Sequence, residues 1–170
     1  MAIRRLNHAV LYVRDVETSV AFYTEVLGFS VLTQLPGAAF LRASGSTNDH
    51  DLGLFAIGAQ AGPSGAGTST VGLYHLAWEV ETLAELGEVE KTLSRAGALV
   101  GKSDHATTKS LYGHDPDGLE FEICWIVPAD RLDDAAKEGA ASIAPLDLDA
   151  ELARYGADTV GGLGVSWPSR

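Results

Sequence analysis

Two histidines and one glutamate lie in apolar runs of the sequence where polar side chains are unusual. His8 falls in LNHAVLYV, His75 falls 67 residues later in LYHLAWEV, and Glu122 falls in GLEFEICWI. Buried imidazoles and carboxylates are costly without a partner, and a divalent metal ion is a partner that binds both. Two histidines and one carboxylate with open positions are typical of non-haem Fe(II) oxygenases. These residue types therefore predict one metal site with room for a substrate.

Strand alternation indicates which side chains share a face. Successive side chains of a strand point to opposite faces, so Glu122 shares a face with Cys124. The opposite face of that run is apolar and consists of Leu119, Phe121, Ile123 and Trp125. We expect helices to dock on the apolar face, and His8, His75 and Glu122 to gather on the other face.

The elements around the two histidines occur twice. Each copy predicts a strand, a helix and then further strands. The first helix follows Asp15, an N-cap residue, and a stop is expected at Gly28; the second helix is expected to stop at Gly97. This pattern indicates an internal duplication.

The duplication also identifies a missing ligand. Setting Ile57 on Ile126 aligns NDHDLGLFAI with PDGLEFEICWI at an offset of 69, close to the 67 of the histidine pair. Under this relation the counterpart of Glu122 is Gly53. A symmetric site would have a fourth protein ligand there, so the gap favours a catalytic metal that keeps a position for water, dioxygen or a chelating substrate.

The chain is expected to comprise one domain over residues 1–127 and an extension over residues 128–170. The domain divides into a first module (1–60) and a second module (71–127), joined by a Gly-, Ser- and Ala-rich linker. The extension packs on the core, on a partner or over a site. Its apolar residues need burial, and we expect them to contribute to the interface of a homodimer or larger assembly; they include Leu146, Leu148, Leu152 and Trp167.

Three more residues are candidates for catalysis. His50 lies three residues before Gly53 and could act as a general acid or base, or be a surface turn residue. Tyr112 could hydrogen-bond a phenolic substrate oxygen, or be an ordinary packed aromatic residue. His105 lies in a polar loop and could support the site or be solvated. We assign no role to His114, which we expect in a turn, and expect Cys124 to be a small buried hydrophobe.

Composition excludes several classes of function. The formal net charge is −11, which argues against binding nucleic acid or anionic membranes. No apolar run approaches the roughly 20 residues of a membrane span, and the N-terminal segment is expected to be a strand rather than a signal peptide. A single cysteine excludes an internal disulfide and is consistent with a cytoplasmic location.

Three motifs together resemble the vicinal oxygen chelate superfamily, which includes glyoxalase I, bleomycin-resistance proteins and type I extradiol ring-cleaving dioxygenases. They are NHAVLYVRDVETSVAFYTEVLGF, YHLAWEV and DHATTKSLYGHDPDGLEFEICW. The resemblance implies an α+β fold in which paired βαβββ modules form a half-open barrel around one metal site. Extradiol dioxygenases commonly have two such paired-module domains per chain, whereas this chain has one.

The sequence is most similar to the metal-bearing domain of the extradiol dioxygenases. That similarity implies the ligands His8, His75 and Glu122, with His50 as acid–base residue, Tyr112 in contact with substrate and His105 behind the ligands. The expected metal is Fe(II), with Mn(II) or another divalent ion as the alternative. The implied reaction is ring cleavage of a catechol-like diol with O2. The alternatives are a glyoxalase-like lyase, isomerase or hydrolase, and a protein that binds a small aromatic molecule without turnover.

Overall fold

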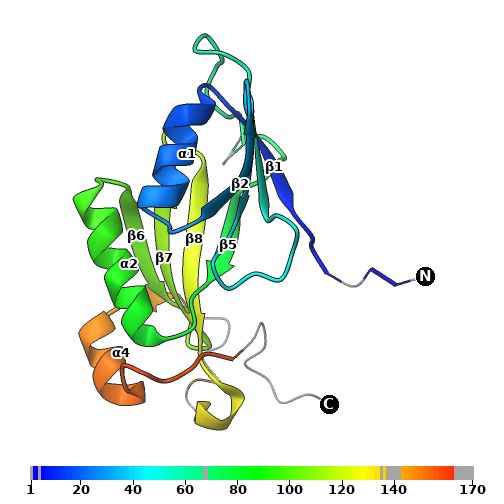
Figure 1. Ribbon diagram of the computed structural model, residues 1–170. Helices are drawn as coiled ribbons and strands as arrows, with labels where there is room; N and C mark the ends of the chain where they lie inside the picture. The colour runs from blue at the N-terminus through cyan, green and yellow to red at the C-terminus, as the bar shows by residue number, and fades with distance from the viewer. Residues whose placement is uncertain (1, 4, 67–68, 135, 137–142, 163–170) are drawn as a thin grey trace. The chain divides into compact units, whose positions relative to one another are not determined.

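The computed structural model describes all 170 residues except 1, 4, 67–68, 135, 137–142 and 163–170. The chain forms two compact units (Figure 1). The first comprises residues 1–65 with 115–118, and the second comprises residues 66–114 with 119–170. Both combine helix with sheet, which confirms the expected α+β class. Among the described residues, no helix has the length and apolar character needed to cross a membrane.

The first unit is one four-stranded sheet with one helix. Its elements are β1 (Ala9–Val13), α1 (Val16–Glu25), β2 (Ser30–Leu35), β3 (Ala38–Arg42) and β4 (Leu52–Ala56), and its strand order is β1-β4-β3-β2. Asp15 caps α1 as expected, since its Oδ1 accepts the Thr18 amide at 2.7 Å. Gly28 follows with φ of +72°, a left-handed conformation that favours glycine. The apolar face of the sheet and Tyr23 of the helix form the core.

The second unit repeats this arrangement and adds an edge strand. Its elements are β5 (His75–Glu79), α2 (Leu83–Arg95), β6 (Leu99–Asp104), β7 (Thr108–His114), β8 (Glu120–Ile126) and β9 (Ala144–Pro145), in the order β5-β8-β7-β6-β9. Thr82 and Glu85 form a capping box at the start of α2. The expected face assignment holds on β8, because Phe121, Ile123 and Trp125 are all buried.

Strand register supports the duplication residue by residue. In the first sheet β1 runs parallel to β4, and Val10 pairs with Gly53. In the second sheet β5 runs parallel to β8, and Ala77 pairs with Glu122. Val10 and Ala77 each lie two residues after the histidine of their module. Gly53 therefore occupies the position of Glu122, as the alignment predicts.

The described part of the extension packs on the second unit. After a short 3-10 turn (Ala129–Arg131), β9 adds to the edge of β6 and α4 (Leu148–Tyr155) lies beside α2 (Figure 1). Leu146 and Leu148 are buried there. Packing on the core is one of the alternatives that the sequence left open, and the contribution of the extension to a subunit interface stays a prediction. Trp167 lies outside the described residues.

Candidate metal centre

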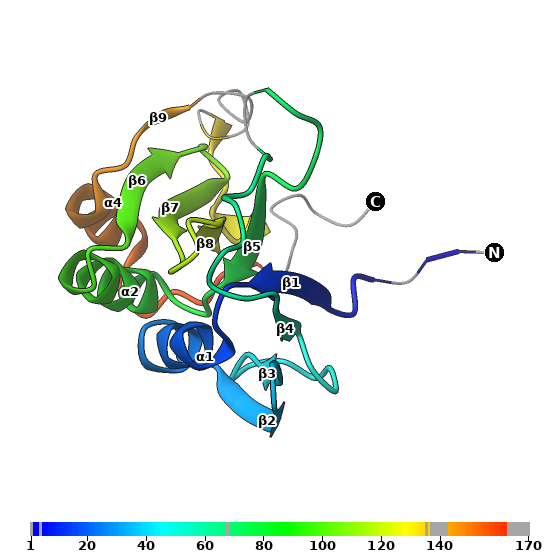
Figure 2. The same cartoon turned by 90° about the horizontal axis from the view of Figure 1, so that it is seen from above.

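Two of the three predicted ligands lie together in the second unit. His75 opens β5 and Glu122 lies on the neighbouring strand β8, on the face away from the helices. His75 Nε2 is 3.0 Å from Glu122 Oε2, and the other carboxylate oxygen, Oε1, accepts the Ser110 hydroxyl at 2.5 Å. The exposed fractions of the two side chains are 23% and 12%. This pair is half-buried, polar and held in one orientation. Figure 2 shows β5, β8 and β7 side by side from above.

The spacing of this pair fits a divalent ion. Two ligand atoms at about 2.1 Å from a metal, in adjacent octahedral positions, are about 3.0 Å apart. The Nε2–Oε2 distance matches that separation. Ser110 leaves Glu122 Oε2 free to coordinate and fixes the carboxylate, as hydrogen-bonding partners of metal ligands do. The residues present therefore fit a metal held between His75 and Glu122.

Glu120 lies on the other side of the His75 ring, and sequence reasoning missed it. His75 Nδ1 is buried and has no hydrogen-bond partner among the described residues, while Glu120 Oε1 is 3.7 Å away. A hydrogen bond to Glu120 and the charge of that residue raise the pKa of Tyr74. Alternation could have identified Glu120, since it is two residues from Glu122 and shares its face.

Ser110 was also missed, although the same alternation places it on the face of Tyr112. His114, expected in a turn, is the last residue of β7, because its pairing with Glu120 extends the strand to that point. Its Nε2 is 3.7 Å from Glu120 Oε2. The second sheet therefore carries more polar groups on its site face than the sequence motifs indicate.

Tyr112 and His105 form a pair beside the carboxylate. Tyr112 lies on β7 directly opposite Glu122, and its hydroxyl is 2.9 Å from His105 Nε2. Burial, together with the charge of Glu122, raises the pKa of Tyr112 above the ordinary value of 10.0, so the phenol keeps its proton at neutral pH. The Tyr112 ring also contacts His75, with centroids 5.8 Å apart. His105 is therefore not merely a solvated loop residue.

The remaining predicted residues, His8 and His50, lie together in the first unit. His8 directly precedes β1 instead of lying inside the strand, because the β1–β4 ladder begins at Ala9. The His8 and His50 rings are 4.4 Å apart between centroids, and the His50 ring also contacts Phe40. His50 is half-buried and precedes β4. These ring contacts distinguish it from a solvated turn histidine.

The loop that carries His50 is held by the carboxylate of Asp51. Asp51 is buried and accepts hydrogen bonds from the Ala43 amide, the Ser46 hydroxyl and the Asn48 side-chain amide, at 2.7–2.9 Å. Such a network restricts the conformations open to the loop. His50 therefore projects from a fixed segment.

Gly53, the counterpart of Glu122, has room for a small side chain. A Cβ built at this residue would lie 3.4 Å from Val10 Cγ2 and 3.6 Å from the Phe40 and Phe55 rings, which is ordinary contact. His8 belongs to the first unit, whereas His75 and Glu122 belong to the second. Within the described ranges no three His, Cys, Asp or Glu side chains are grouped closely enough to hold a metal ion. Coordination by all three predicted ligands is therefore a proposal.

Comparison with curated proteins finds relatives named as dioxygenases. The chain is 33% identical over 121 residues to a catechol-2,3-dioxygenase of Bacillus subtilis, with 69% of this chain and 40% of that protein covered. It is 32% identical over 127 residues to biphenyl-2,3-diol 1,2-dioxygenase 3 of Rhodococcus globerulus, with 70% and 62% covered. The chain thus spans less than two thirds of the length of either relative.

A third relative has nearly the length of this chain. The trivalent organoarsenical cleaving enzyme of Thermomonospora curvata is 29% identical over 153 residues, with 87% of this chain and 94% of that protein covered. Among solved structures, a glyoxylase/bleomycin resistance protein/dioxygenase domain from Frankia sp. EAN1pec matches with a TM-score of 0.61 and 24% identity, covering 72% of this chain and 92% of that one. That likeness shows the fold.

A family model gives the assignment directly. Residues 5–123 match the model of the Glyoxalase/Bleomycin resistance protein/Dioxygenase superfamily. The matched range covers most of both modules and includes all three predicted ligands and the Gly53 position. The strand register, which pairs Gly53 in one module and Glu122 in the other at equivalent positions, agrees with the motifs that suggested this family. The chain belongs to the Glyoxalase/Bleomycin resistance protein/Dioxygenase superfamily.

Proposed function

We propose that this protein is a non-haem Fe(II)-dependent extradiol dioxygenase that cleaves the ring of a catechol-like aromatic diol with O2. The observation that supports it most is the pair of His75 and Glu122, spaced for adjacent coordination, with glycine at the equivalent fourth position. His8 completes the ligand set. Mn(II) or another divalent ion is the alternative metal. When bound, the ion supplies Lewis acidity, orienting the diol and stabilising its anionic form.

The chain's own residues then divide the work of binding and proton transfer. Tyr112 stays protonated and donates a hydrogen bond to a diol oxygen. In the tautomer of His105 that carries its proton on Nε2, the ring donates to the Tyr112 oxygen and directs the phenolic proton toward the substrate. His50 accepts a proton from the diol and returns it during attack on the ring. The rings of Phe40 and Phe55 near Gly53 provide apolar surface for the aromatic ring.

The related organoarsenical cleaving enzyme suggests a second candidate, because its length matches this chain almost completely. Trivalent arsenic is thiophilic, and a site for it would use soft thiolate ligands. The only cysteine, Cys124, is buried, and burial with the nearby Glu122 and Glu79 charges raises its pKa to about 12. A thiol in that state captures soft metal ions poorly. This chemistry favours the diol over an organoarsenical.

A glyoxalase-like reaction without O2 is the other alternative. Glyoxalase I enzymes usually carry a glutamate at the position of Gly53, and its absence here favours a chelated diol. A binding protein without turnover would require neither the metal nor His50. As in the sequence interpretation, we propose a cytoplasmic homodimer or larger assembly. Exposed apolar residues on the site face of the first sheet, Val10 and Tyr12, support association.

An oxygen electrode tests the proposal. Protein loaded anaerobically with Fe(II) is mixed with O2 and a panel of catechols, and the absorbance of the yellow ring-cleavage product is followed in the same cuvette. We expect O2 uptake equal to the diol consumed, and no uptake by His75→Ala protein. Metal-loaded protein that binds catechols but consumes no O2 would exclude the dioxygenase and favour the lyase or the binding protein.

A further inference from the structure

A buried lysine lies on the opposite face of β7 from Tyr112. The Lys109 side chain has no solvent exposure, and its Nζ is 2.6 Å from Asp104 Oδ1 and 3.0 Å from Glu151 Oε2. It also lies over the ring of Tyr155, 5.8 Å from the centroid. A buried charge is tolerated only when it is paired, and these two carboxylates pair it. Glu151 comes from α4, so the extension supplies half of the pairing.

Asp104 connects this buried cluster to the loop that carries His105. The same Oδ1 that binds Lys109 accepts the Ala106 amide at 2.7 Å. Ala106 has φ of +62°, a left-handed conformation that is unfavourable for a residue with a Cβ and persists only where neighbouring contacts hold it. The turn held in this way brings His105 within 2.9 Å of the Tyr112 hydroxyl.

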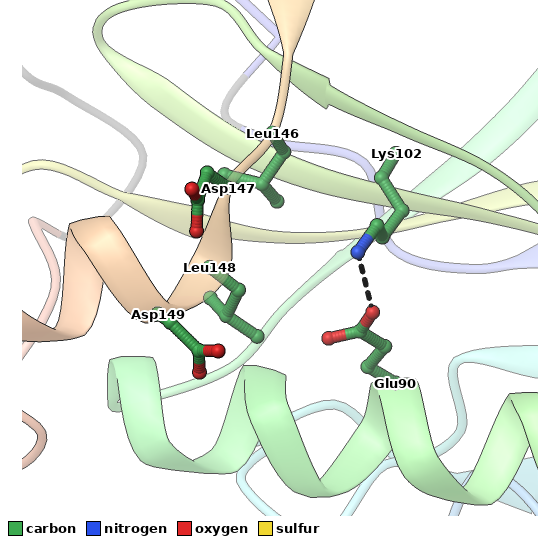
Figure 3. Close-up of a pocket in the computed structure, with 6 residues that line it drawn as sticks. All are labelled: Glu90, Lys102, Leu146, Asp147, Leu148 and Asp149. Atoms are coloured by element: carbon green, nitrogen blue, oxygen red, sulfur yellow. Dashed lines mark hydrogen bonds and ion pairs between the residues drawn. The ribbon is translucent and has the colours of Figure 1, made fainter.

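Contacts of the extension with β6 and α2 hold it beside this cluster. β9 pairs with β6 at Ser103 and Asp104, next to the turn. Leu148 packs over Gly87 of α2, where a Cβ would lie 3.6 Å from its Cδ2. Leu146 and Leu148 line a pocket of about 360 Å³. Figure 3 shows them with the ion pair of Lys102 and Glu90, which belongs to the same pocket. Glu151 is therefore presented to Lys109 by a segment with its own apolar anchors.

We propose that Glu151 and Lys109 are positioning residues that act on the His105–Tyr112 pair through Asp104 and the Ala106 amide. The extension thereby contributes to the reaction from behind the sheet, without touching the substrate. This inference rests on the proposed function for its kinetic consequence, while the geometric linkage itself is independent of the reaction. Neither Glu151 nor Lys109 contacts His75 or Glu122, so metal content is expected to be unaffected.

The test compares Glu151→Gln with Glu90→Gln. The first removes the charge that pairs Lys109, while the second breaks an ion pair in the same unit, beside the same extension, that does not reach Asp104. We expect Glu151→Gln to lower kcat on a catechol on the order of tenfold, because orientation of the reacting groups is loosened. KM and bound metal should stay within about twofold, as orientation and not binding is changed. Glu90→Gln should match wild type.

A double-mutant cycle separates positioning from general destabilisation. If Glu151 acts through the pair, Glu151→Gln should cause little further loss in a Tyr112→Phe background. Equal losses in both backgrounds would overturn the proposal, since they would show that Glu151 acts elsewhere. All assays are run at temperatures where thermal melts show each variant folded.

A second measurement does not depend on turnover. Amide hydrogen exchange at Ala106 and the NMR shifts of the His105 ring are recorded for wild type, Glu151→Gln and Glu90→Gln. We expect faster exchange at Ala106 and a displaced His105 signal in Glu151→Gln alone. These changes in a protein that does not cleave catechols would reject the proposed reaction and retain the linkage. An unchanged Ala106 amide and His105 ring would reject the linkage.

Discussion

The two sheets share strand order and register, yet their site faces differ in chemistry. In the second sheet, Glu122 is flanked by Tyr112 on β7 and receives a hydrogen bond from Ser110. In the first sheet, the equivalent of Glu122 is Gly53, and the residue across from it on β3 is Phe40. Where one module has a carboxylate and a phenol, the other has no side chain and an apolar ring.

This difference indicates that the site faces of the two modules diverged after the duplication. Each sheet packs a helix of its own unit on its buried face, whereas the site face is free to diverge since it is not needed for the core. The second unit carries a carboxylate, a phenol and the hydroxyl that orients the carboxylate. The first unit carries the His8–His50 pair and the rings of Phe40 and Phe55.

Removing the Glu122 carboxylate from the second unit should have the largest effect on metal binding and activity. We expect Glu122→Ala to lower metal affinity by more than about 100-fold, because losing a ligand costs more than losing one of its hydrogen-bonding partners. Activity should fall with the metal and return only partly at high metal concentration. Elemental analysis after dialysis measures this, with Glu79→Ala as a β5 control. Full metal occupancy in Glu122→Ala would remove Glu122 from the ligand set.

Giving the first unit a carboxylate at position 53, as the second unit has at Glu122, should abolish activity while keeping the metal. We expect Gly53→Glu to bind metal at least as tightly as wild type and to lose turnover, because a fourth ligand occupies the substrate's position. Gly53→Ala is the matched control, since its Cβ would make only ordinary contacts. Wild-type turnover in Gly53→Glu would show that position 53 does not face the metal.

The histidine pair of the first unit should affect proton transfer more than binding. We expect His50→Phe to lower kcat by roughly 10²–10⁴-fold, the usual contribution of a positioned acid–base residue. Its metal content and its catechol affinity should stay within a few-fold of wild type. If His50→Phe protein instead lost its metal, His50 would be a metal ligand. The proposed ligand set of His8, His75 and Glu122 would then have to be revised.

The smallest effect is expected from the hydroxyl that orients the carboxylate. Ser110→Ala should weaken metal binding by about 10–100-fold, because Glu122 loses the hydrogen bond that fixes its orientation. Titration with Fe(II) under anaerobic conditions measures this affinity, and Ser103→Ala on β6 provides the comparison. Equal affinities in Ser110→Ala and wild type would mean that the sheet alone orients Glu122.

Much of this molecule was predictable from local sequence. The cap at Asp15 depends on residues adjacent in the chain, and the left-handed Gly28 and Gly97 follow helix ends in the same way. Alternation along β8 predicts that Glu122 and Trp125 point to opposite faces. The equivalence of Gly53 and Glu122 followed from the repeat, because two copies of one strand pairing must share a register.

Only the tertiary structure identified contacts that cross between strands or reach back from the extension. Ser110 meets Glu122 because β7 and β8 pair in one particular register, which no single strand reveals. Lys109 falls on the buried face by alternation, but its partner Glu151 is 42 residues further along the chain. Periodicity reports which face a residue takes, whereas long-range packing decides which charge it meets there. Long-range packing also determines that Leu148 contacts Gly87 of α2 and that the extension packs on this helix.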